Sequence, residues 1–223
     1  CRSGDFSGFG EYKWMNFTTD NKELVKACDV VVLAVSPEQF MEIDINAEEK
    51  TVVSVMAGVT IERIMKITGT EKVVRSMSNP AAEIGLAYSP WYSVGLDDAE
   101  KKRVRKIFEV IGKTDEVKSE DEINHFTALT GPVPGFVAYF AECMSEYAVK
   151  NGIDEYVAER AVRQLFHAAG VMLAKSDASP KEHVQIMLDY AGTTAAGLEK
   201  MKESPLAESI EKGLEAAYDE AKG

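Results

Sequence analysis

The segment Leu188–Leu198 holds the residue types with the clearest chemical use in this chain. Gly192 is followed by two hydroxyl residues, Thr193 and Thr194, which predicts a loop that opens a helix with one of the threonines as N-cap. A helix N-terminus offers unpaired N–H groups and a partial positive charge, so it can hold a small carboxylate. Helix caps are far commoner than binding sites, and local features alone therefore favour a structural helix start.

The elements that must position this segment differ between the two halves of the chain. Up to about residue 118, short apolar runs alternate with helical patterns, which is typical of a parallel βαβ sheet. The expected elements are strands over Val30–Val35, Thr51–Val55 and Lys72–Met77, and helices over Asn21–Cys28, Thr60–Thr68 and Asp97–Ile111.

From Ser119 onward the pattern predicts helices alone. Their expected start signals are Ser119 with Glu122, Asp154, Ser179-Pro180 with Glu182, and Ser204-Pro205. Small residues recur along these helices and permit close packing, either against a partner chain or within a monomeric bundle: Ala138, Ala141, Ala148, Ala161, Ala168 and Ala169.

Composition indicates an ordinary globular protein. The chain has 223 residues, of which 45% are hydrophobic and 28% charged, and its formal net charge is −12. These values suit one or two domains, and the acidic balance argues against nucleic acid or an anionic membrane as main partner. Local donors must therefore hold any anionic ligand against an unfavourable overall field.

Cysteine and histidine usage predicts neither a disulfide framework nor a metal site. Cys1, Cys28 and Cys143 are widely spaced, and buried packing is expected of them. The three histidines lack the spacing of zinc ligands. No apolar run approaches the ~20 residues of a membrane span and no signal peptide is visible, so a reducing cytoplasm is the expected compartment.

The beginning of the chain lacks the glycine-rich turn that normally opens a dinucleotide-binding domain. Gly4, Gly8 and Gly10 do not form GxGxxG, and no apolar strand precedes them. Two interpretations stay open: the sequence is partial, or the cofactor function is lost. The run Asp29–Val35 favours the first, because it is typical of an interior strand with neighbours on both sides.

Six short segments, in order along nearly the whole chain, resemble motifs of the pyrroline-5-carboxylate reductase family. Ala57–Ile61 matches the family's Ala-Gly-Val-Thr-Ile, and Leu188–Leu198 corresponds to its Ser-Pro-Gly-Gly-Thr-Thr-x-x-Gly-Leu. The remaining similar segments are Asp20-Asn21 with Glu23, Ala34–Pro37, Arg75–Asn79 and Thr127–Gly131.

This resemblance implies a fold and an activity. The fold is an α/β Rossmann-like parallel sheet over residues 1–118, without its first strand and glycine-rich turn, followed by an all-α dimerisation domain over residues 119–223. The activity is NADPH-dependent hydride transfer to the C=N carbon of a cyclic imine, turning 1-pyrroline-5-carboxylate into L-proline in amino-acid biosynthesis. The resemblance also implies a homodimer or a higher homo-oligomer.

The resemblance also implies roles for individual residues. An arginine at the end of the second strand favours NADPH, with NADH as the alternative. The implied cofactor contacts are Arg2 and Ser3 at the adenosine 2′-phosphate, Asn21 by the adenosine ribose, Ala34, Val35 and Pro37 along the dinucleotide, and Ala57 and Gly58 near the nicotinamide ribose. The implied substrate contacts are Ala191, Gly192 and Thr193 at the carboxylate, and Thr194 as the catalytic hydroxyl against the imine nitrogen.

Most of these residues also have a structural interpretation. Pro37 could end a strand, Gly58 could allow a turn, and Asn21 could cap a helix. Arg75 could form an ordinary ion pair, and it is not assigned to catalysis.

Three departures from the family pattern bear on the substrate and the cofactor. Ser36 replaces a lysine, and Thr130–Gly135 replaces a more flexible hinge. Asp189-Tyr190-Ala191 replaces Ser-Pro-Gly, and a carboxylate at Asp189 repels a substrate carboxylate unless it points outward or is paired. An imine reductase with a different substrate, such as a cationic iminium, therefore stays open.

Two further classes of protein are weighed against the imine reductase. One is a non-catalytic or cofactor-free relative that acts as a dimeric interaction protein. The other is a β-hydroxyacid-type dehydrogenase, which would carry a lysine on the interdomain helix, and Gly131–Tyr147 contains none.

Overall fold

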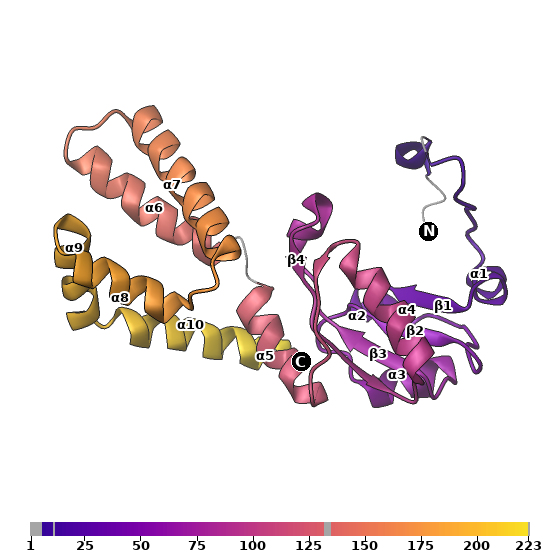
Figure 1. The fold of residues 1–223 in the computed structure, drawn as a ribbon. Helices are drawn as coiled ribbons and strands as arrows, with labels where there is room; N and C mark the ends of the chain where they lie inside the picture. The colour runs from indigo at the N-terminus through magenta and orange to yellow at the C-terminus, as the bar shows by residue number, and fades with distance from the viewer. Residues whose placement is uncertain (1–5, 11, 132–134, 223) are drawn as a thin grey trace. The chain divides into compact units, whose positions relative to one another are not determined.

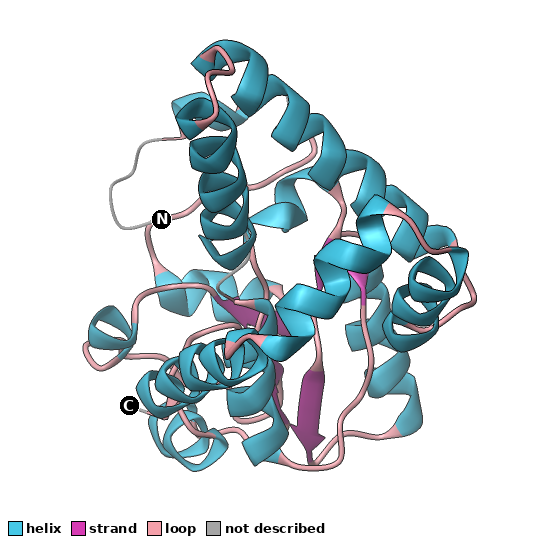
Figure 2. Cartoon of the chain, turned by 90° about the vertical axis from the view of Figure 1, so that its left-hand side faces the viewer, coloured by secondary structure: helices cyan, strands magenta, loops and turns pink. Residues whose placement is uncertain are grey.

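The computed structural model describes residues 6–10, 12–131 and 135–222. The chain divides into two compact units, Cys1–Gly131 together with Ala217–Gly223, and Pro132–Ala216. Each unit is described by itself. All strands of the described residues lie in the first unit, whereas the second is built from helices (Figures 1 and 2).

The main sheet has four strands in the order β1-β2-β3-β5. Its strands are β1 (Val30–Leu33), β2 (Thr51–Ser54), β3 (Val73–Ser76) and β5 (Trp91–Val94). The first three are parallel, which confirms the predicted strands, and β5 runs antiparallel to β3. β5 was not predicted, and two short strands, β4 (Ala87–Tyr88) and β6 (Gly112–Lys113), form a second small sheet.

Within the described residues β1 ends the sheet and pairs with β2 alone. The second neighbour that its apolar sequence predicts is therefore not seen there. One face of the strand shows the consequence, because Val32 is 49% exposed while Val31 and Leu33 are buried.

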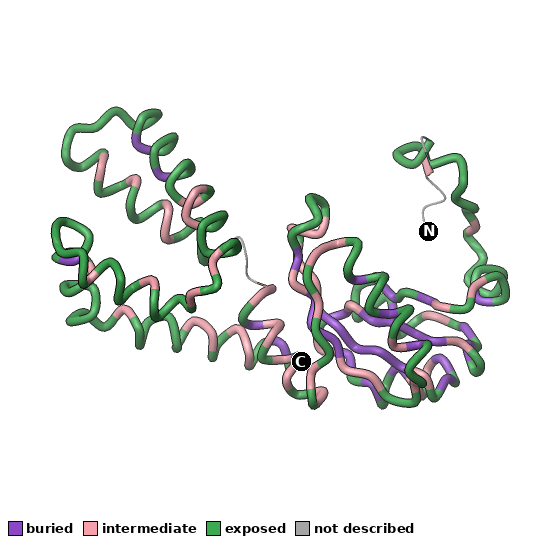
Figure 3. The backbone as a smooth tube through the Cα atoms, viewed as in Figure 1, coloured by how far each residue is buried: buried purple, intermediate pink, exposed green. Residues whose placement is uncertain are grey.

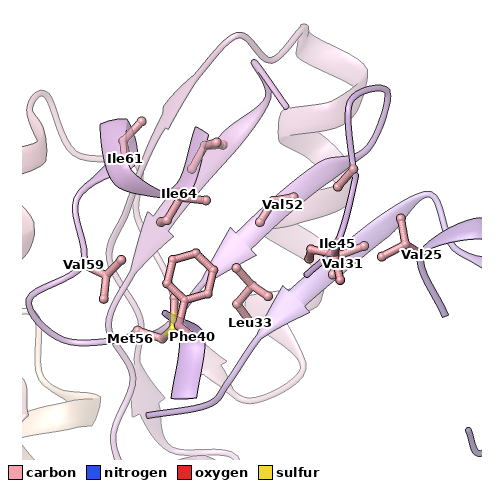
Figure 4. Packing of buried hydrophobic residues seen from close by; sticks show 12 residues of the cluster. Val25, Val31, Leu33, Phe40, Ile45, Val52, Met56, Val59, Ile61 and Ile64 are labelled. Carbon is pink, nitrogen blue, oxygen red and sulfur yellow. The ribbon is translucent and has the colours of Figure 1, made fainter. Parts of the chain in front are cut away.

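Both faces of the sheet carry an apolar core. On one face, Val52 and Val73 pack with Phe40 and Ile64 from the neighbouring helices, as Figure 4 shows for part of this cluster. On the other face, Val53 and Val74 pack with residues of helix α4 (Asp98–Glu109), which follows β5. Successive strand residues point to opposite faces, so a run of valines serves both cores. The helices and 3-10 turns of this unit are η1 (Ser7–Phe9), α1 (Asn21–Ala27), α2 (Pro37–Phe40), α3 (Ile61–Thr68), η2 (Pro80–Ile84), α4 (Asp98–Glu109) and α5 (Glu120–Thr130).

The predicted helix starts are mostly confirmed. Ser179 and Glu182 form a complete capping box, and Asp154 accepts from the N–H of Val157. Ser119 caps its helix, but the Glu122 carboxylate accepts from the N–H of Lys118, so only half of that box forms. The remaining helices are α6 (Gly135–Lys150), α7 (Glu155–Lys175), α8 (Pro180–Tyr190), α9 (Thr193–Glu203) and α10 (Leu206–Ala221).

In the second unit α6 packs on α7 and α8 packs on α9. The face of α7 that turns inward carries Ala158 and Val162, which are buried. The stripe of larger apolar side chains on the same helix is exposed in the single chain, with Leu165 at 49% and Met172 at 66%. Figure 3 shows most of α7 in the colour of exposed residues.

The structure tests two expectations from composition, the burial of the cysteines and the lack of a membrane-spanning helix. Cys143 is exposed and Cys28 is half-buried, so buried packing was wrong for Cys143, and Cys1 lies outside the described residues. Across residues 6–10, 12–131 and 135–222, every helix is too short or too polar to cross a membrane.

Candidate functional site

The ends of the parallel strands bring together most of the predicted cofactor residues of the first unit. β1 and β2 are neighbours in register, with Leu33 opposite Ser54. The segments Ala34–Pro37 and Ala57–Gly58 follow these two strands directly, so they lie along the same edge of the sheet. In open α/β sheets this carboxyl edge is where ligands bind.

The turn after β1 continues into a helix. Ser36 is the N-cap of α2, and its hydroxyl accepts from the N–H of Gln39 at 3.2 Å within a complete capping box. Pro37 occupies the first helical position, so its structural role is to start α2. Ser36, the residue that departs from the family's lysine, therefore has a local use as a cap.

The turn after β2 is held from both sides. Met56 and Val59 are buried, while Ala57 between them is exposed. Gly58 has φ +68°, a conformation that favours glycine. The turn leads to Thr60, which caps α3 by accepting from the N–H of Arg63. Exposed Ala57 and half-buried Gly58 thus lie on a loop that is anchored on both sides.

The three other predicted cofactor residues do not lie in the segments that follow β1 and β2. Asp20, not Asn21, is the N-cap of α1 and accepts from the N–H groups of Lys22 and Glu23, so the suggestion that Asn21 caps a helix was wrong. Asn21 is the first helical residue and is exposed. Arg2 and Ser3 lie outside the described residues.

Arg75 forms the ion pair that its sequence position allowed. Its Nη1 lies 3.0 Å from Oε1 of Glu120, and its Nη2 donates to Oδ1 of Asn124 at 2.7 Å. The sequence reasoning missed both partners, because they lie on α5, far along the chain from β3.

The predicted substrate segment in the second unit is a helix start with an unusual cap. The N-cap is Gly192, with φ +97°, and no side chain caps the helix. The prediction that Thr193 or Thr194 is the N-cap was therefore wrong, since both are already helical. Ala191 before it has φ 60°, which is strained for a residue with a Cβ.

This helix start leaves donors open. The first N–H groups of a helix have no intrahelical acceptor, and here no side chain supplies one. Gly192, Thr193 and Thr194 are all exposed, so the N–H groups and two hydroxyls lie at the surface of this unit. The local geometry suits a small anion.

Asp189 has a partner on its own helix. Its Oδ1 accepts from Nε2 of Gln185, one turn earlier on α8, at 2.7 Å. The amide is neutral, so this hydrogen bond orients the carboxylate without offsetting its repulsion of a substrate carboxylate nearby. Tyr190 beside it is exposed. In the described part of the chain, no group of three or more His, Cys, Asp or Glu residues could hold a metal ion.

Comparison with known proteins matches both units. Residues 120–223 match the family model for pyrroline-5-carboxylate reductase dimerisation, and residues 7–58 match one described as NADP oxidoreductase coenzyme F420-dependent. A pyrroline-5-carboxylate reductase of Vibrio alginolyticus is 27% identical over 212 residues, covering 92% of this chain and 78% of that protein.

Solved structures agree with these matches. A pyrroline-5-carboxylate reductase from Coxiella burnetii superimposes with a TM-score of 0.86 at 28% identity, covering 97% of this chain and 83% of that one. Plasmodium falciparum pyrroline carboxylate reductase, solved with NADP bound, gives 0.78 at 27% identity over 93% and 81%.

The fold defines the class: a Rossmann-like domain joined to a helical dimerisation domain, as in NAD(P)-dependent oxidoreductases. Within that class, the chain is similar over most of its length to pyrroline-5-carboxylate reductases, and the resemblance drawn from its motifs is confirmed.

Proposed function

We propose that this protein reduces 1-pyrroline-5-carboxylate to L-proline with NADPH. The observation that carries the proposal is the start of α9, where Gly192 leaves the N–H groups of Thr193 and Thr194 without a side-chain cap. When bound, NADPH supplies a hydride to the C=N carbon, and the imine nitrogen carries the added proton of the resulting amine. The similarity to pyrroline-5-carboxylate reductases supports this reaction.

The edge of the sheet fits a dinucleotide. Ala34, Val35, Pro37 and Ala57 are exposed there, and Gly58 adds a turn without a side chain. No bulky group therefore blocks an extended ligand at these positions. We assign these five residues to the dinucleotide, as the resemblance implies.

Three other residues are assigned to the adenosine end of the cofactor. We assign Asn21 to the adenosine ribose, and Arg2 and Ser3 to the 2′-phosphate. An arginine there favours NADPH over NADH, and the NADP-bound Plasmodium relative supports the same choice.

In the second unit, the backbone of Ala191, Gly192 and Thr193 receives the substrate carboxylate, and the Thr194 hydroxyl faces the imine nitrogen. A helix N-terminus favours the anion through its dipole. A protonated imine is already electrophilic, so the site needs position more than a strong acid. This explains why no histidine or glutamate pair is required.

A different imine is the second candidate, and the change to Asp189 and Tyr190 favours it. Gln185 donates to Asp189, but a neutral amide does not offset repulsion between this carboxylate and a bound anion. A substrate without a carboxylate, or with a cationic centre, suffers no repulsion there.

We infer a homodimer or a higher homo-oligomer that forms through the helical unit. The match to a dimerisation family and the exposed stripe with Leu165 and Met172 support it. A cytoplasmic location is part of the proposal, and it rests on the few, widely spaced cysteines.

The test follows NADPH oxidation with 1-pyrroline-5-carboxylate and, side by side, with 1-pyrroline, which lacks the carboxylate. Turnover of the carboxylated imine supports the proposal, and turnover of 1-pyrroline alone supports the second candidate. If neither imine is reduced and NADPH does not bind, the protein is the cofactor-free interaction protein instead.

A further inference from the structure

The side chain of Arg75 connects the sheet to α5. It lies in β3 and is 3% exposed. Its guanidinium reaches Glu120 and Asn124, which stand one turn apart on α5. A buried guanidinium with two oriented acceptors fixes both position and angle of its partners, because its donors are held in a planar fork.

The Glu120 carboxylate accepts a second hydrogen bond from the first residue of α3, which follows the turn after β2. Oε1 of Glu120 accepts from the backbone N–H of Ile61 at 2.8 Å. Ile61 is the first residue of α3, where N–H groups have no intrahelical acceptor and a negative charge is favoured. One oxygen atom therefore joins α3, β3 and α5.

The far end of α5 is attached to the sheet as well. Asn79, which follows β3, donates from Nδ2 to the carbonyl of Thr130 at 3.1 Å. Its Oδ1 accepts from the N–H of Ala81 at the start of η2. α5 is thus attached at one end to β3 and the start of α3, and at the other end to the segment that follows β3.

We propose that Arg75 and Glu120 are positioning residues for the nicotinamide end of the cofactor. They hold the turn Ala57–Thr60 through the N–H of Ile61, so that Ala57 and Gly58 keep the backbone path that admits the nicotinamide ribose. Neither residue touches the cofactor. This inference rests on the proposed NADPH-dependent function. An error of about 1 Å in such a loop can cost on the order of a hundredfold in rate, which makes a rigid link consequential.

The first measurement uses the protein without cofactor. Glu120→Ala removes the acceptor, and we expect the Ile61 amide to exchange hydrogen about tenfold faster, the value of one hydrogen bond to a charged group. Glu120→Gln keeps an acceptor oxygen, so its Ile61 exchange rate should lie between those of Glu120→Ala and the parent. Unchanged exchange in Glu120→Ala would overturn the link between α5 and the loop.

The second measurement separates the two ends of the cofactor. Glu120→Ala should raise the Kd of NADPH about tenfold, while adenosine 2′,5′-bisphosphate, which has no nicotinamide, binds as it does to the parent. Equal losses for both ligands, or no loss for NADPH, would overturn the assignment to the nicotinamide end.

Glu116→Ala is the matched control. Its side chain is 30% exposed, against 29% for Glu120, and it accepts from Lys101 at 2.6 Å. The change should alter neither Ile61 exchange nor NADPH affinity. If the parent itself does not bind NADPH, the proposed function fails and the nicotinamide assignment with it, and the exchange result still decides whether Glu120 orders the loop.

Discussion

The two compact units bury their apolar side chains to different extents. In the first unit, Val52, Val53, Val73 and Val74 are completely buried, and each face of the sheet carries a buried apolar cluster. In the described part of the second unit, only Ala158, Val162 and Ala195 among the hydrophobic residues are buried. Figure 3 shows the same contrast along the chain.

The difference separates a unit that closes its own core from one that does not. A soluble chain seldom leaves a large apolar surface uncovered unless something binds there. The helices of the second unit match a dimerisation family, and their exposed stripe is what such an interface needs. The first unit thus buries an apolar core, whereas the second leaves most of its larger apolar side chains exposed in the single chain.

The largest effect is expected from a cavity in the first unit. Ile64 on α3 is completely buried in the core cluster of Figure 4. Ile64→Ala should lower the free energy of unfolding by about 2–5 kcal/mol, because it removes contacts and leaves a void. Chemical denaturation followed by circular dichroism measures it. A loss of unfolding free energy below that of a typical surface substitution would show that the first unit does not have a closed apolar core.

Thr194→Ala tests whether the start of α9 serves chemistry instead of stability. We expect turnover to fall on the order of a hundredfold, as when one positioned proton-transfer group is lost. The Kd of NADPH and the melting temperature should hardly change, since Gly192 is the cap. Steady-state kinetics, a cofactor titration and a thermal melt give the three values. Equal rates in variant and parent would remove Thr194 from the site.

Leu165→Asp tests the uncovered face of the second unit. A charge in the centre of an interface should raise the dissociation constant of the oligomer at least about tenfold, with the far-UV spectrum unchanged. Leu86→Asp is the control, because Leu86 is an exposed leucine of the first unit. Sedimentation of both variants over a range of protein concentrations measures this dissociation constant. An unchanged oligomer in Leu165→Asp would mean that this stripe is not the interface.

The smallest effect concerns acid stability of the first unit. The hydrogen bond from Lys72, then that from the backbone of Asp97, lowers the pKa of Glu100 below its ordinary value. This carboxylate therefore adds stability that is fully present above the ordinary glutamate pKa of about 4.3. The contribution is lost as the pH falls through that value toward the lowered pKa of the folded state.

Glu100→Gln should remove that pH dependence. The capping box that Glu100 forms with Asp97 sets the scale, about 1 kcal/mol at neutral pH. Unfolding free energies at neutral pH and near pH 4 measure the effect. Parallel curves for variant and parent would show that the Lys72 contact does not stabilise the fold.

Local signals explain most of what could be predicted. Strand β2, helix α3 and the cap at Ser179 rest on residues within a few positions of one another, so periodicity and capping rules apply. The order of short motifs, including Ala57–Ile61, identified the family. These features depend on neighbours along the chain, and they are present in the structure.

Other features depend on contacts that no local pattern records. β5 pairs antiparallel with β3, and Trp91 on this strand is completely buried. Gly192 rather than a threonine became the cap of α9, since its backbone adopts φ +97°.

The sequence by itself thus determined the class of fold, the resemblance to pyrroline-5-carboxylate reductases and the segments to which the site is assigned. The tertiary structure decided what those segments touch: Glu120 joined Arg75 to the N–H of Ile61, and Leu165 stayed exposed. The physical reason is that hydrogen bonds and burial between residues far apart in the chain arise only after the elements have packed.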